Sequence, residues 1–183
     1  MQLKLLNLAT GLLAVSSVQA LVIPRAQSSS SDVVASLTSL AKQADASTLV
    51  INKLKPGNIL STGLTVIGEV TKVLSSLTKA GTALRSASAS TTTTDTTTQQ
   101  NVCTLVKTVT DSATGLLTTL NANLSKLVGS ILAIPLSAVV GLLRSAFSGL
   151  QTQVQVNSPS CAPETDAGFD LISTLLNTLT LTN

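Results

Sequence analysis

Residues 59–85 read ILSTGLTVIGEVTKVLSSLTKAGTALR, and this stretch decides the fold class. Its apolar residues recur mainly at steps of three and four: they are Leu60, Leu64, Ile67, Val70, Leu74, Leu77 and Leu84. Such steps place side chains on one face of an α-helix, whereas a half-buried strand alternates every second residue. The stretch therefore predicts an amphipathic helix that buries one face against other helices.

The same spacing recurs in other parts of the chain. The further predicted helices are 32–54, 102–134, 135–157 and 163–179. The first begins after a capping pair, Ser31-Asp32, and ends at Lys55-Pro56-Gly57-Asn58, where Pro and Gly break a helix. A turn this short places the two helices on either side of it antiparallel. The sequence predicts an all-α bundle of four or five amphipathic helices over residues 32–183.

Residues 86–101, SASASTTTTDTTTQQN, interrupt this pattern. They lack the large apolar residues whose burial offsets the entropy cost of ordering the chain, so we expect an exposed loop. Dense hydroxyls in a secreted protein are typical of an O-glycosylated spacer, and a plain flexible linker is the alternative. The predicted sites are Thr91, Thr92, Thr93, Thr94, Thr96, Thr97 and Thr98. Asn123, in the sequon Asn123-Leu124-Ser125, is a further predicted glycosylation site.

The first twenty residues have the features of a secretory signal peptide. Lys4 supplies a positive charge, residues 5–15 are largely apolar, and Val18-Gln19-Ala20 ends in the small-x-small pattern of a cleavage site. The apolar run is too short to span a membrane. We expect residues 1–20 to be removed and the protein to be extracellular or in the cell wall. Residues 21–31 are then a short leader, cut after Arg25, or a flexible N-terminus.

Two cysteines, Cys103 and Cys161, follow the signal sequence. An even number of cysteines in an oxidising compartment favours a disulfide, so we predict that they form one bridge. The alternatives are a thiol nucleophile or a metal ligand. The chain has no His to support either role.

The composition argues against catalysis and against nucleic-acid binding. The chain has no His, Trp or Tyr, only 10% charged residues and a net charge of +3. Its basic residues are scattered and have no interleaved aromatics. Without His, no Ser-His or Cys-His pair can form, so we expect no enzyme, no cofactor and no metal site. One local acidic group, Glu164, Asp166 and Asp170, fits a helix N-terminus better than a Ca²⁺ loop.

Residues 127–143 carry no charge and are the part of the chain after the signal sequence that most resembles a membrane span. Seventeen residues lie at the lower limit of spanning length, and Gly129, Pro135 and Gly141 interrupt the run. We therefore predict a buried helical hairpin here and no transmembrane segment.

Residues 32–156 resemble the fungal hydrophobic-surface-binding proteins, a family that includes the cell-wall galactomannoproteins. The resemblance rests on the helix pattern and on Ala/Ser/Thr/Leu-rich stretches such as VVASL at 33–37 and LLTTL at 116–120. The Thr-rich segment, the cysteine pair and the last helix depart from the family. The resemblance implies secretion, association with the cell surface or wall, and binding of hydrophobic surfaces or lipids within a helical bundle.

The aliphatic helix faces, the low charge and the missing catalytic set predict a non-enzymatic protein that binds hydrophobic surfaces, lipids or fatty acids. Binding would use a cavity between helices or an opening that exposes the core. The predicted ligand-binding residues are Leu120, Leu124, Leu127, Ile131, Leu143 and Phe147. Cell-wall polysaccharide is a further expected partner. The alternatives are a structural cell-wall glycoprotein without a ligand and a secreted effector.

Overall fold

A computed structural model of the protein describes residues 30–54, 59–88, 96–124 and 133–181. These residues form five α-helices and one short 3-10 helix, and no strand occurs among them, which confirms the predicted all-α fold. The elements are α2 (Ser30–Asn52), α3 (Ile59–Ser88), α4 (Thr96–Leu124), α5 (Ala133–Asn157), η2 (Pro159–Cys161) and α6 (Ala162–Leu181).

Threonine is frequent in these helices although β-branched residues are only moderate helix formers. Many of its hydroxyls donate a hydrogen bond to the carbonyl one turn earlier in the same helix. Thr48 Oγ1 lies 2.8 Å from the Ala44 carbonyl oxygen, and Thr71 Oγ1 lies 2.7 Å from that of Ile67. These bonds satisfy the hydroxyl within its own helix, so threonine can stand beside the apolar face without a partner on another helix.

The helices extend further into the Thr-rich segment than the sequence predicts. The predicted loop covered 86–101, but α3 continues through Ser88 and α4 begins at Thr96. Adding a residue to an existing helix gains one hydrogen bond for each residue fixed, so a polar sequence can continue a helix that packing has nucleated. Gln99 and Gln100 are also good helix formers. Residues 89–95 lie outside the described residues.

The fourth helix was predicted to begin at Pro135, and in the structure it begins two residues earlier. α5 begins at Ala133 with Pro135 in its first turn, so Ile134 belongs to α5 and not to the preceding helix. Amides in a first turn have no intrahelical acceptor, and the missing N–H of proline therefore costs little there. α4 ends at Leu124, and residues 125–132 lie outside the part that the structure describes.

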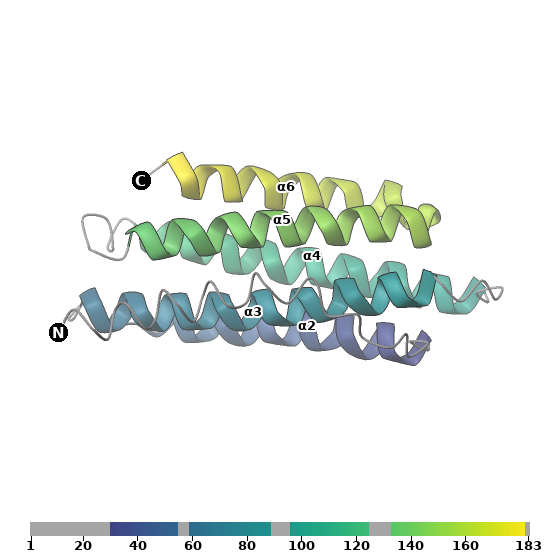
Figure 1. Ribbon diagram of the computed structural model, residues 1–183, viewed down its shortest axis with the longest axis horizontal. Helices are drawn as coiled ribbons and strands as arrows, with labels where there is room; N and C mark the ends of the chain where they lie inside the picture. The colour runs from purple at the N-terminus through teal and green to yellow at the C-terminus, as the bar shows by residue number, and fades with distance from the viewer. Residues whose placement is uncertain (1–29, 55–58, 89–95, 125–132, 182–183) are drawn as a thin grey trace.

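The five helices alternate in direction along the long axis (Figure 1), and the contacts between them close a ring. α2 packs against α3 and α4, α6 packs against α4 and α5, and α3 packs against α5. Over the described residues, α4 does not pack closely against α3 or α5. The order around the ring is therefore α2, α3, α5, α6 and α4, and α4 faces the α3–α5 pair across the interior.

α4 and α6 run in the same direction, and α4 meets η2 and α6 at two points that are two helical turns apart. Cys103 and Cys161 form the predicted disulfide, with a Cα–Cα distance of 5.0 Å and a sequence separation of 58 residues. Thr110 and Gly168 have the same separation and are in direct contact. A constant separation over two turns is the mark of parallel helices. The bridge thus fixes the register of α4 and α6 near the starts of both.

Further hydrogen bonds between helices lie at the disulfide end of the bundle. Asn157 Nδ2 of α5 donates to the Leu84 carbonyl oxygen near the end of α3, at 3.3 Å. Gln151 and Gln155 of α5 donate to Asp166 Oδ1 of α6, at 3.4 and 3.2 Å. Together with the disulfide, these bonds connect α3, α4, α5 and α6 at one end.

Candidate functional site

Two of the acidic residues near the start of α6 have structural roles. Glu164 lies in the first turn of the helix, where a negative charge is favourable, and Asp166 accepts the two glutamine amides of α5. The residues that the structure describes contain no group of three or more His, Cys, Asp or Glu side chains that could hold a metal ion. These carboxylates are therefore explained by helix stability and by the packing of α5 against α6.

The uncharged stretch 127–143 lies partly outside the described residues, since the description resumes at Ala133. From there Leu136, Val139, Val140 and Leu143 are buried in the core, and Leu142 is partly buried against it. None of the described helices is both long and apolar enough to cross a membrane. The apolar face of α5 is thus covered by other helices of the bundle.

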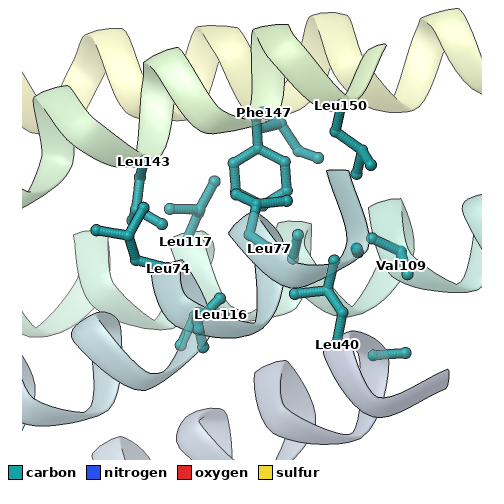
Figure 2. Packing of buried hydrophobic residues seen from close by; sticks show 14 of the residues in the cluster. Leu40, Leu74, Leu77, Val109, Leu116, Leu117, Leu143, Phe147 and Leu150 are labelled. Atoms are coloured by element: carbon teal, nitrogen blue, oxygen red, sulfur yellow. The ribbon is translucent and has the colours of Figure 1, made fainter. Parts of the chain in front are cut away.

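The interior of the ring is the candidate site. Helices in contact have axes about 8–10 Å apart, so five helices in a ring enclose a wider interior than four. Because α4 stands away from α3 and α5, side chains must fill that space. Figure 2 shows the ring of Phe147 projecting from α5 towards Leu77 of α3 and Leu117 of α4. Leu143 of α5 and Leu74 of α3 approach each other beside it (Figure 2).

Three of the six predicted ligand-binding residues lie in this interior. Leu120, Leu143 and Phe147 belong to one cluster of buried side chains, each exposed by 4% or less. Leu124 is the last residue of α4, and its side chain lies outside the described part, as do Leu127 and Ile131. The structure therefore places half of the predicted set around one apolar centre. Their contact with a ligand stays a prediction.

α3 and the inner face of α4 contribute further residues to this centre, which were not among the predicted ligand-binding residues. These are chiefly Leu74, Leu77 and Leu117. The sequence did contain an indication of these residues, namely the adjacent leucines Leu116 and Leu117. Both are buried in the structure. Adjacent buried residues require an apolar face wider than a single stripe. Val139-Val140 in α5 shows the same feature, as expected for helices that pack against two neighbours and also face an interior.

A polar group interrupts the apolar face where α2 meets α3. Ser47 occupies a position on the buried face of α2 and is fully buried. Its hydroxyl donates to Oε2 of Glu69 in α3 at 2.9 Å and accepts from Nε2 of Gln43 at 3.2 Å. Oε1 of Glu69 lies 2.6 Å from Nζ of Lys72. Glu69 is only 7% exposed, so this carboxylate is held inside the protein by a hydroxyl and an ammonium group.

The predicted glycosylation sites fall in three different settings. Asn123 is half-buried near the end of α4, and its side-chain Nδ2 donates to the Thr119 carbonyl oxygen at 2.8 Å. Residues 96–98 form the first turn of α4, although their side chains are not described, and residues 91–94 lie outside the described residues. The amide nitrogen of Asn123, which would carry a glycan, is thus engaged within its own helix.

The fold is similar to that of a protein of known structure. No protein-family model matches the sequence, and no curated protein matches it. The structure of AFMP4P, determined in complex with palmitic acid, superposes with a TM-score of 0.71. The match covers 84% of this chain and 99% of that chain, with 11% sequence identity. At this identity the likeness shows a shared fold.

Proposed function

We propose that this protein is a secreted, non-enzymatic lipid-binding protein of the cell surface or wall, and that fatty acids or other apolar chains bind inside its helical ring. The observation that carries the proposal is the closed ring of five helices, in which α4 faces α3 and α5 across an interior filled by aliphatic side chains and Phe147. Such an interior offers dispersion contacts and hydrophobic burial to an acyl chain.

The comparison with AFMP4P supports this proposal, because that protein has the same fold and was crystallised with palmitic acid. An acyl chain inside this protein would have to displace or rearrange core side chains such as Leu117 and Phe147. A core made almost entirely of Leu, Val, Ile and Ala tolerates rearrangement better than one built on polar networks. We also propose that the chain is a distant member of the hydrophobic-surface-binding family that its composition resembles.

The absence of Trp and Tyr allows a direct test of binding. In a Phe147→Trp variant, the single tryptophan replaces a ring at the centre of the bundle, so a bound acyl chain must change its emission. Leu171 lies on the outer face of α6 and is 47% exposed, and Leu171→Trp therefore provides the matched control. We expect palmitate to alter the emission of the Phe147→Trp protein in a saturable manner and to leave the Leu171→Trp protein unchanged.

The same two variants distinguish binding in a cavity from opening on a hydrophobic surface. On polystyrene beads, an opened bundle would expose the central tryptophan, and its emission would shift to longer wavelength. A bundle that adsorbs without opening would keep the buried spectrum. If palmitate leaves both spectra unchanged and the protein is not depleted from solution by the beads, the proposal is wrong.

Secretion and attachment to the wall are tested on protein from its own host. We propose that residues 1–20 are removed and that the Thr-rich segment carries O-linked glycans, which would connect the protein with cell-wall polysaccharide. Intact mass before and after deglycosylation reports both events and any lipid that co-purifies. A mass that equals the full bare polypeptide, with the first twenty residues present, would contradict this part of the proposal.

A further inference from the structure

The outer surface of the α2–α3 hairpin combines exposed lysines with exposed leucines. We propose that this surface docks the protein on a lipid bilayer that contains anionic phospholipids. The inference goes beyond the binding of lipids inside the ring and does not depend on it, because it concerns the outside of the hairpin. Docking would place the bundle at a store of acyl chains.

The outer side of α2 carries a lysine and a leucine on one line. The buried residues of this helix, from Val33 to Ile51, mark its inner side. Lys42 and Leu49 lie seven residues apart, so about two helical turns bring them to the same side, which is opposite to the inner one. Lys53 follows the end of α2, one turn beyond Leu49. All three side chains are exposed, and that of Leu49 is 59% exposed.

The outer side of α3 repeats this combination. Lys72 and Lys79 are also seven residues apart, and Leu64 lies about two turns before Lys72. These residues are exposed and lie opposite to the buried Val70 and Leu77 of the same helix. Because α2 and α3 pack against each other, the two outer sides form one surface, which we call the hairpin face. It consists of Lys42, Leu49, Lys53, Leu64, Lys72 and Lys79.

The charges of the bundle are divided between opposite sides. The described residues of the hairpin, 30–54 and 59–88, contain five basic residues against three acidic ones, and one of the acidic ones, Glu69, is buried. The order of the helices in the ring places α6 on the side away from the hairpin (Figure 1). The acidic residues of α6 are Glu164, Asp166 and Asp170. The lysines are scattered in the sequence, but the fold gathers them on one side.

This combination of residues fits the surface of an anionic bilayer. Each lysine near such a surface strengthens binding by about fivefold, and exposed apolar side chains add to this by entering the boundary between head groups and acyl chains. Lysine can keep its ammonium group at the head groups while its apolar stem follows the leucines. The lysines are spread along two helices and not gathered in a pocket, which suits a continuous charged surface better than a single phosphate group.

Co-sedimentation of the protein with lipid vesicles tests the role of charge. We expect binding to be at least about tenfold stronger on phosphatidylcholine vesicles with about one third phosphatidylserine than on phosphatidylcholine alone, and to be lost in about 0.5 M NaCl. Lys79→Gln should weaken binding to the anionic vesicles by about fivefold. The matched control is Lys79→Gln combined with Asp170→Asn, which restores the native net charge by a change on α6. It should bind as weakly as Lys79→Gln alone.

A tryptophan on the hairpin face tests its contact with the bilayer, since the chain has no other tryptophan. The emission of Leu49→Trp should shift to shorter wavelength on the anionic vesicles, whereas that of Leu171→Trp, on α6, should not change. Equal binding to both kinds of vesicle, binding to neither, or recovery of native binding by the double variant would overturn the proposal. So would an unchanged emission of Leu49→Trp or an equal shift of Leu171→Trp. None of these results bears on the uptake of palmitate, which Phe147→Trp reports separately.

Discussion

The contact between α4 and α6 at Gly168 gives a sharp test of the packing. A Cβ atom placed on Gly168 would lie 2.7 Å from Oγ1 and 2.8 Å from Cβ of Thr110. The second distance is the important one, because Cβ is fixed to the backbone and a rotation of the threonine side chain cannot move it. Gly168→Ala therefore forces the two helices apart, near the disulfide that holds them together.

The expected change in the free energy of unfolding of Gly168→Ala follows from two opposing effects. Alanine stabilises a helix interior by roughly 0.5–1 kcal/mol relative to glycine. Overpacking of a close contact costs roughly 1–3 kcal/mol. Because the clash involves two Cβ atoms and α4 is held by a disulfide, we expect the upper part of that range and a net loss of about 1–2 kcal/mol. A Cβ atom placed on Gly141 in α5 would meet no atom of another described helix within 4 Å, so Gly141→Ala should be stabilising.

Urea denaturation followed by circular dichroism at 222 nm measures both variants, and it suits a helical chain without tryptophan. The free energy of unfolding of Gly168→Ala should be about 2–3 kcal/mol lower than that of Gly141→Ala. Both variants gain the helix propensity of alanine, but only Gly168→Ala has the overpacking cost. If Gly168→Ala is as stable as Gly141→Ala, the close approach of α4 and α6 at this point does not exist.

Three further predictions concern the core, the bridge and the surface. Replacing Cys103 and Cys161 together by alanine should lower the free energy of unfolding by about 4 kcal/mol, because the bridge closes a long loop; urea denaturation under non-reducing conditions measures the difference. Phe147→Ala should cost about 3–5 kcal/mol by leaving a cavity at the centre, and Phe147→Leu clearly less, in the same assay. Asp111→Asn should change stability by no more than about 0.5 kcal/mol, because its pair with Lys107 is exposed and screened by water.

The sequence was sufficient for the helical class, most helix limits and the disulfide, because these depend on local information. Spacing by three and four residues identifies a helix without knowledge of its neighbours, and a proline marks a first turn by its missing amide. A chain with only two cysteines allows only one intramolecular pairing. The limits near Ser88 and Thr96 were not predictable in this way, because packing elsewhere nucleates a helix that polar residues then continue.

The order of the helices around the ring was decided only by the tertiary structure. Periodicity shows that a helix buries one face, but not which helix covers it, so the separation of α4 from α3 and α5 has no local signal. The same holds for Ser47, which is ordinary as a residue type and acquires its setting only because Glu69, on another helix, comes within hydrogen-bonding distance. Gly168 likewise acquires its role from Thr110, 58 residues earlier. These contacts join residues far apart in the chain, and their energies depend on how whole helices pack, which no single stretch of sequence determines.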